Sequence, residues 1–244
     1  MGKTAVTHGN GVRAHIPGAH FTPSRPGALA ADVRRILIVG AGGFGREVLN
    51  WAHDAWPNHG DLVVGFLAAD CSPGNEPPLQ RPILGPPSHY VPVAGDGLLL
   101  AIGIPGVRRV VAEELESRGA AFLTLVHPSA IVAPTAAVGR GAVVCPYAVV
   151  SDRARLGRCA LMNYHSSLGH DASAGDFAVL SPYATLGGNA HVHDDVFMGL
   201  HATVGPGRTI GSRSKISANS CALADVPPES IVYGSPGRIG PLLH

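Results

Sequence analysis

The sequence predicts two fold classes in one chain, an α/β N-terminal domain of the Rossmann-like type followed by an all-β parallel β-helix of hexapeptide repeats. Apolar residues at every sixth position from Val132 to Ala222 predict the β-helix. A buried strand, a glycine-rich turn and a helix in succession from Arg34 to Trp56 predict the α/β domain. With 45% hydrophobic and 14% charged residues, the chain can bury a sizeable core.

Residues 1–33 are rich in Gly, Pro, Ala and His and show no period. Pro17, Pro23 and Pro26 break any helix there, so we expect a poorly ordered extension. We assign residues 34–126 to the α/β domain, 127–225 to the β-helix and 226–244 to a short C-terminal cap.

The glycine-rich turn has the sequence Gly40-Ala41-Gly42-Gly43-Phe44-Gly45 and lies between a strand, Arg34–Val39, and a helix, Arg46–Trp56. Gly40 permits a tight turn, Gly42 lets a phosphate approach the backbone, and Gly45 lets helix and strand pack closely. The helix N-terminus offers unpaired N–H groups and a partial positive charge. The turn is therefore a candidate nucleotide site, with a purely structural turn as the alternative.

Four further strands and one helix complete the expected parallel domain. The strands are Asp61–Leu67, Pro82–Gly85, Leu98–Ile102 (ending in Gly103) and Phe122–Val126, and the helix is Val107–Ser117 with Val110, Val111 and Leu115 inward. About ninety residues are too few for a complete dinucleotide fold but suit a mononucleotide or a nucleotide-linked sugar. Asp70 is the nearest candidate for a ribose contact.

The hexapeptide repeat keeps its register over sixteen successive apolar positions, of which fourteen are Val, Leu, Ile or Met. Two places before each position lies a mostly small residue, and the place after it is often Gly. A period of six fits neither a helix nor a strand, but it fits triangular coils of three short strands. We expect the apolar and small residues to point inward, Gly to permit the tight corners, and the fifteen hexapeptides to make five coils.

Residues eighteen apart should stack in columns along this prism. The columns of interest are Asp152, His170, Gly188 and Pro206; Arg153, Asp171, Asn189 and Gly207; and Tyr147, His165, Tyr183, His201 and Asn219. A histidine beside an acid is suited to take a proton near neutral pH, and Gly188 could offer its N–H to a developing oxyanion. The alternative is that these histidines are ordinary surface residues, or, for His165 and His201, residues of a trimer interface.

Several function classes are disfavoured. A net charge of +1 without a basic block argues against nucleic acid or an acidic membrane surface as partner. Zinc is not expected, because no third histidine falls at a coil-related position beside His165 and His201. Four widely spaced cysteines suit a reducing compartment. Neither a membrane span nor a secretory signal is indicated, so the cytoplasm is the expected location.

Several motifs of the chain, taken together, resemble those of a known family. The glycine-turn domain, then His127-Pro128-Ser129-Ala130 opening the repeat, then Gly169-His170-Asp171 and Gly175-Asp176-Phe177 resemble bacterial sugar acetyltransferases of the PglD/NeuD type, over roughly residues 35–240. The resemblance implies a left-handed β-helix and a homotrimer with sites between subunits. It also implies transfer of acetyl from acetyl-CoA, without a required metal, to the amino group of a nucleotide-linked amino sugar.

The resemblance also implies roles for single residues. His170 would be the general base, Asp171 would tune it, and the Gly188 N–H would meet the acetyl carbonyl. Leu200 and Ala218 would line the acetyl-CoA channel, while the residues that would bind the nucleotide-sugar are Ala41, Gly42, Gly43 and Gly103.

The chain departs from the family pattern at three places. Val179 replaces a histidine that contacts the acetyl donor, Ala68-Ala69 replaces an acidic pair, and Phe44 replaces a histidine in the glycine turn. Two alternatives therefore stay open: O-acyl transfer to a sugar hydroxyl, and a non-catalytic binding or scaffold trimer.

Overall fold

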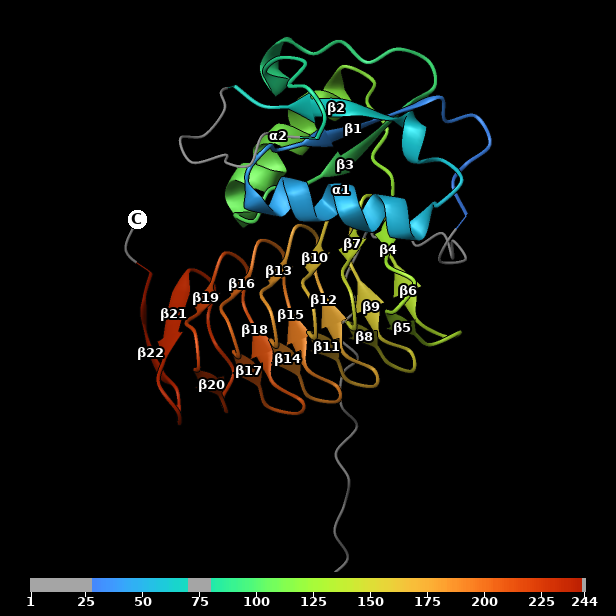
Figure 1. Cartoon of the computed structure of the whole chain (residues 1–244). Helices are drawn as coiled ribbons and strands as arrows, with labels where there is room; N and C mark the ends of the chain where they lie inside the picture. Colours follow the sequence, from blue (N-terminus) through green and yellow to red (C-terminus); the bar gives the residue numbers. More distant parts are fainter. Residues whose placement is uncertain (1–27, 70–79, 243–244) are drawn as a thin grey trace, which may run out of the picture.

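The computed structural model describes residues 28–69 and 80–242, and it consists of an α/β layer seated on a long three-sided solenoid (Figure 1). Asp70, the predicted ribose contact, and most of the predicted N-terminal extension lie outside the described residues. The last residues assigned to that extension are described, and Leu29 and Val33 pack partly buried against the core of the α/β layer.

The α/β domain is a three-stranded parallel sheet, in the order β2-β1-β3, between two helices. Its elements are β1 (Arg35–Val39), α1 (Gly43–Ala55), η1 (Gly60–Leu62), β2 (Val63–Leu67), η2 (Pro87–His89), β3 (Asp96–Leu100) and α2 (Pro105–Ser117). The apolar run of β1 serves both faces of the sheet, since Ile36 and Ile38 pack with α1 while Leu37 and Val39 pack with α2. This two-sided burial explains why the run has no polar alternation.

Two of the expected strands are not strands of this sheet. Pro82–Gly85 makes a single bridge, between Ile83 and Phe66. In the segment 122–126, Phe122 bridges to Leu98, while β4 (Leu125–Val126) pairs with the solenoid instead. Val126 lies one six-residue step before Val132, so the solenoid begins earlier than the sequence analysis expected.

The expected inward face of the second helix was also partly wrong. Leu115 is buried as predicted, but Val110 is 65% exposed. The helix begins at Pro105, and its buried residues are Pro105, Arg108, Ala112 and Leu115. An arginine thus occupies the centre of the inward face, where the pattern of apolar residues gives no sign of it.

The solenoid is a left-handed parallel β-helix with three faces. Face 1 contains β4, β7 (Val143–Val144), β10 (Leu161–Met162), β13 (Val179–Leu180), β16 (Phe197–Met198), β19 (Lys215–Ile216), β21 (Ser230–Tyr233) and the antiparallel β22 (Arg238–Pro241). Face 2 contains β5 (Ile131–Val132), β8 (Val149–Val150), β11 (Ser167–Leu168), β14 (Thr185–Leu186), β17 (Thr203–Val204) and β20 (Cys221–Ala222). Face 3 contains β6 (Ala137–Val138), β9 (Arg155–Leu156), β12 (Ser173–Ala174), β15 (His191–Val192) and β18 (Thr209–Ile210).

Each two-residue strand pairs with the strand one coil away, and its second residue is the sixth-position residue of the repeat. These residues and the small residues two places earlier form one continuous core along the axis. Arg208 is an exception among the small positions, because its side chain is exposed. The predicted inward periodicity is confirmed, and the solenoid is longer than expected by one strand at each end.

The corners use glycine differently from the expectation. The left-handed backbone recurs every six residues three places after the core residue, and it is adopted mostly by other residue types, among them Tyr147, His165 and Asp171. The glycine directly after the core residue has no such conformation. At Gly139, for example, an added Cβ would lie 2.5 Å from the carbonyl carbon of Gly157 in the next coil. At Gly139 the close approach of the next coil therefore leaves no room for a side chain.

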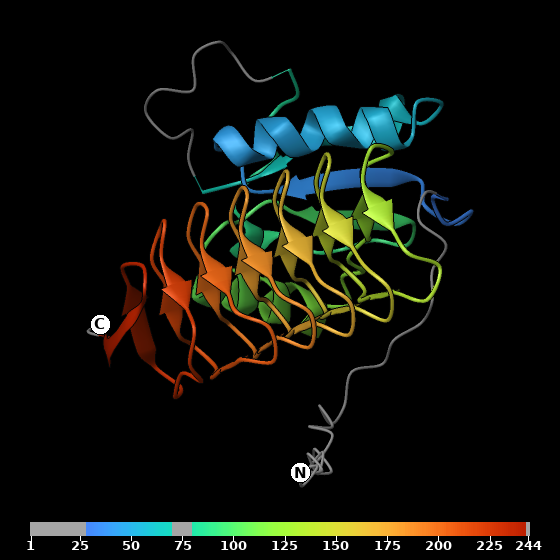
Figure 2. The same cartoon turned by 90° about the horizontal axis from the view of Figure 1, so that it is seen from below.

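The α/β layer covers one face of the solenoid and one neighbouring edge (Figure 2). Outward residues of face 1, such as Leu161 and Val179, share a core with α1. Cys159 and Phe177, in the turns from face 3 to face 1, pack with α2. We name these turns edge 3–1, the turns from face 1 to face 2 edge 1–2, and those from face 2 to face 3 edge 2–3. Edge 2–3 lies opposite the covered face. No helix in the described residues is long and apolar enough to cross a membrane.

Candidate active site

His170 lies on edge 2–3, in the turn that follows β11, and its side chain is 64% exposed. Its Nδ1 lies 3.0 Å from Oδ2 of Asp171. Asp171 has a left-handed backbone, with φ of 58°, which places neighbouring side chains of the turn side by side. An acid that accepts the Nδ1 proton leaves the Nε2 lone pair free, and this is the tautomer that a general base requires.

Arg153, one coil earlier, holds the Asp171 carboxylate in place. Its Nε donates to Oδ1 at 2.7 Å and its Nη2 donates to Oδ2 at 3.0 Å. The hydrogen bonds from Arg153 and then from His170 lower the pKa of Asp171 to about 2. Arg153 lies eighteen residues before Asp171, so the repeat predicts that the two are neighbours, but the sequence alone indicates no role for Arg153. The carboxylate therefore stays charged near neutral pH.

We expect Arg153→Gln to raise the pKa of Asp171 from about 2 toward the ordinary value of 3.8. Its folded pKa lies below the ordinary value, so the stability from this carboxylate is present above that value and is lost as the pH falls toward 2. A ¹³C NMR titration of the Asp171 carboxyl measures the shift. Equal midpoints in the two proteins would contradict the assignment of Arg153 as its partner.

Gly188, one coil beyond His170, lies directly under the imidazole ring. A Cβ added to Gly188 would overlap Nε2 of His170 and would lie 2.6 Å from Cε1. Among the described residues, no acceptor is paired with the Gly188 N–H, whereas its carbonyl accepts from Gly207 N at 3.0 Å. The His170 imidazole and an available amide donor are thus neighbours, an arrangement that suits an acyl-transfer site.

Gly188→Ala is expected to lower turnover by about 10²-fold, because the new methyl group must displace the imidazole, and a displacement near 1 Å has that effect in well-aligned sites. The solenoid should stay folded, since the position lies on a surface turn. Turnover and thermal unfolding would be measured together. Gly207→Ala is not a suitable control, because the backbone of Gly207 has a positive φ. Gly106→Ala, in the first turn of α2, is the matched control, because a Cβ there would meet nothing within 4 Å, and a similar loss in both variants would contradict the proposed contact.

The glycine turn of the α/β domain has the geometry expected for phosphate binding. Gly40 has φ of +114°, and an added Cβ at Gly45 would overlap the Gly40 carbonyl oxygen. Gly42 is the N-cap of α1, and the first turn of that helix contains no acidic residue. A Cβ at Gly42 or at Gly103 would meet nothing within 4 Å, so the space above them is open.

The predicted site residues do not come together within one protomer. His170, Asp171 and Gly188 lie on edge 2–3, opposite the face that the α/β domain covers. Leu200, which is 50% exposed, and Ala218 lie on edge 1–2, and the two edges flank face 2. The glycine turn, including the buried Ala41, with Gly43 and Gly103, belongs to the α/β layer (Figure 1).

The predicted ring column is confirmed on edge 1–2. His165 stacks on Tyr147 with 5.0 Å between ring centroids and on Tyr183 with 4.8 Å, and His201 continues the stack at 4.7 Å. The rings of Tyr147 and Tyr183 are exposed. An exposed, self-stacked column beside Leu200 and Ala218 gives this edge a rigid apolar surface.

Three solved structures show where this architecture occurs. PerB from Caulobacter crescentus, in complex with CoA and GDP-perosamine, is similar to this chain with 26% sequence identity and a TM-score of 0.74. The similar region covers 84% of this chain and 97% of the PerB chain. The acetyltransferase domain of PglB from Neisseria gonorrhoeae FA1090 has 25% identity over 84% and 98% of the two chains and a TM-score of 0.63. WeeI from Acinetobacter baumannii AYE has 23% identity over 84% and 99%, and its TM-score of 0.76 supports the fold.

The chain resembles sugar acetyltransferases of the PglD/NeuD type over most of its length. No protein-family profile matches the chain, and no curated protein sequence matches it significantly. The similarity is therefore carried by the arrangement of the α/β domain on the hexapeptide solenoid, together with the identity of about one residue in four.

The three departures from the PglD/NeuD pattern have structural explanations. Val179 is 2% exposed on face 1, where it packs beneath α1, so an apolar residue suits this position. Phe44 contacts Trp51 edge to face at 5.9 Å. Ala68 is partly buried against the same core, and its N–H donates to the Gly85 carbonyl. All three positions thus pack in or against the core shared by α1 and face 1.

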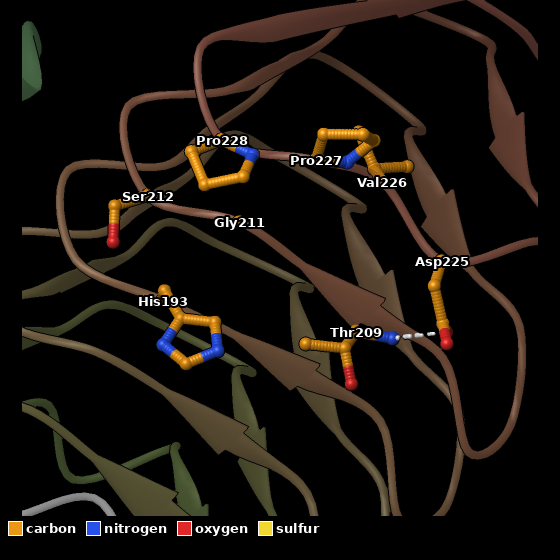
Figure 3. A pocket seen from close by; sticks show the side chains of 8 residues that line it. All are labelled: His193, Thr209, Gly211, Ser212, Asp225, Val226, Pro227 and Pro228. Carbon is orange, nitrogen blue, oxygen red and sulfur yellow. Dashed lines mark hydrogen bonds between the residues drawn. The ribbon is translucent and has the colours of Figure 1, made fainter.

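The hollow shown in Figure 3 is not at the predicted site. It has a volume of about 650 Å³ and is shallow, and its lining residues are His193, Thr209, Gly211, Ser212, Asp225, Val226, Pro227 and Pro228. The Asp225 carboxylate in this hollow accepts a hydrogen bond from the Thr209 N–H at 2.9 Å. Within residues 28–69 and 80–242, no group of three or more metal-binding side chains is gathered.

Proposed function

We propose that the protein transfers an acetyl group from acetyl-CoA to the amino group of a nucleotide-linked amino sugar. The observation that carries the proposal is the pairing of His170 with Asp171 beside the Gly188 N–H. The likeness to PerB, which was solved with CoA and GDP-perosamine, supports the substrate class. The open turn at Gly42 offers a place for the phosphates of the nucleotide.

In the proposed reaction, the amine nitrogen attacks the thioester carbonyl carbon and a C–N bond forms. Nε2 of His170 takes the proton that the nitrogen loses, while Asp171 stabilises the imidazolium through Nδ1. The oxyanion of the tetrahedral intermediate accepts a hydrogen bond from the Gly188 N–H. The C–S bond then breaks, and the CoA thiolate leaves and is protonated.

The site requires a second protomer, because its proposed halves lie on two edges of the same prism. Face 2 lies between these edges, and its outward residues are Ile131, Val149, Ser167, Thr185, Thr203 and Cys221, none of them charged. Face 3, by contrast, presents Arg155. We propose a trimer in which face 2 turns inward, so that edge 2–3 of one protomer meets edge 1–2 of the next. The acetyl-CoA channel beside Leu200 and Ala218 then opens onto His170 of the neighbour.

The proposal is tested by incubating the protein with acetyl-CoA and a panel of nucleotide-linked sugars, each in an amino and a hydroxyl form. Mass spectrometry of the sugar product, with release of CoA thiol, would establish transfer. Acetylation of the hydroxyl forms alone would replace N-acyl by O-acyl transfer. Binding of acetyl-CoA or the nucleotide-sugar without product in any combination would favour the scaffold alternative.

A further inference from the structure

Arg108 is the largest fully buried side chain of the described residues, with 0% exposure. Its guanidinium donates only to backbone carbonyls, and in the described part of the chain no carboxylate pairs with it. Burial lowers its pKa to about 10, so it remains charged at neutral pH. An unpaired buried charge is costly, and apolar packing would fill the same space without that cost.

The four acceptors of Arg108 belong to two different parts of the molecule. Nη1 donates to the carbonyls of Leu100 at 2.9 Å and Ile102 at 2.7 Å, at the end of β3. Nε donates to the carbonyl of Cys159 at 2.5 Å, and Nη2 lies 3.4 Å from that of Ala160. Cys159 and Ala160 form a turn of edge 3–1. A single planar group therefore joins the α/β sheet to the solenoid.

The carbonyls at the end of β3 are in turn joined to the glycine turn. Ala101 lies between Leu100 and Ile102, and its N–H donates to the Val39 carbonyl at 2.8 Å. The Ala101 carbonyl oxygen is so close to Gly40 that a Cβ there would lie 2.5 Å from it. Gly103 follows directly after the bonded carbonyls. Solenoid, Arg108, the end of β3 and the glycine turn thus form one continuous series of contacts.

We propose that Arg108 is a positioning residue that fixes the glycine turn and Gly103 relative to the solenoid. The inference rests on the proposed function, because the nucleotide would be held by the α/β layer while acetyl transfer occurs on the solenoid. Apolar packing between α1 and face 1 is non-directional and tolerates small slides. The rigid fork of an arginine sets direction as well as distance, and a lysine cannot reproduce it.

Arg109 offers a matched control on the same helix. It also ties α2 to the solenoid, with Nε 2.9 Å from Asp195 and its guanidinium 4.3 Å from the Phe177 ring centre. It makes no contact with the end of β3 in the described residues. Loss of Arg109 therefore weakens the docking of α2 without releasing the carbonyls beside Gly103.

The test compares Arg108→Met, Arg108→Lys and Arg109→Met with the wild type. For Arg108→Met we expect KM for the nucleotide-sugar to rise about tenfold or more, with KM for acetyl-CoA changed less than about twofold. Amide hydrogen exchange in segments 40–45 and 101–104 should become faster. Arg108→Lys should show the same changes to a smaller extent, and Arg109→Met should leave both readouts near the wild-type values.

The exchange measurement needs no substrate, so it separates the two proposals. If the wild type acetylates no sugar but exchange in these segments still rises in the Arg108 variants alone, the proposed function fails and the positioning role stands. Unchanged exchange and KM in a folded Arg108 variant would overturn the positioning role, as would equal changes in Arg109→Met. If Arg108→Met does not fold, Arg108→Lys, which keeps the stem and the charge, decides the same question.

Discussion

His170→Ala is expected to lower kcat for acetyl transfer by about 10²–10⁴, the range for loss of a general base. The protein should stay folded, because the ring is largely exposed and its one polar partner is Asp171. Surface substitutions of this kind usually change the free energy of unfolding by less than about 0.5 kcal/mol. Steady-state kinetics with both substrates and a thermal unfolding curve measure the two effects.

The matched control for this variant is His193→Ala, in the turn of edge 3–1 that follows β15 and in the hollow of Figure 3. We expect it to turn over at the wild-type rate. Asp171→Asn should be slower than the wild type but faster than His170→Ala, since it removes orientation of the ring and leaves Nε2 in place. A folded His170→Ala protein with wild-type turnover would remove the proposed role of the histidine.

The solenoid could be predicted from sequence because its inward positions obey one packing rule in every coil. Val144, Met162 and Leu180 occupy equivalent places, so the period alone identifies them. The same rule placed Arg153 and Gly188 beside the Asp171 and His170 turn. The start was missed because Leu125–Val126 reads equally well as a strand of a parallel sheet, and a short apolar run does not reveal its partner.

The backbone conformation of the corners and the burial of a polar side chain in α2 could not be predicted from the pattern of apolar residues. Several left-handed corners are formed by residues such as Tyr147 and Phe177, whose types do not indicate a positive φ in a sequence. Val110 is exposed and Arg108 is buried because the inward face of α2 must bond free carbonyls of β3 and the solenoid. The carbonyls that accept from Arg108 lie far from it in the sequence or in another element, so these hydrogen bonds are known only from the folded structure.

Thr185→Arg is expected to dissociate the proposed trimer and to reduce turnover by at least about 10²-fold, although it leaves His170 untouched. Thr185 lies at the middle of uncharged face 2, where its Oγ1 accepts from Ser167 Oγ at 3.2 Å. An arginine there would bury an unpaired charge in the proposed interface, and such charges strongly oppose association. Sedimentation velocity and kinetics measure the two effects, with Thr209→Arg on face 3 as the matched control.

Co-expression gives a sharper test of a site shared between protomers. His170→Ala lacks the half on edge 2–3, and Ala218→Trp should block the half on edge 1–2, so each homotrimer should be inactive. In a mixed trimer, an Ala218→Trp protomer supplies His170 and a His170→Ala protomer supplies the open channel, which rebuilds an intact site. Recovered turnover is the expected result. Activity that stays lost in purified mixed trimers would place both halves of the site in one protomer and contradict the proposed packing of face 2.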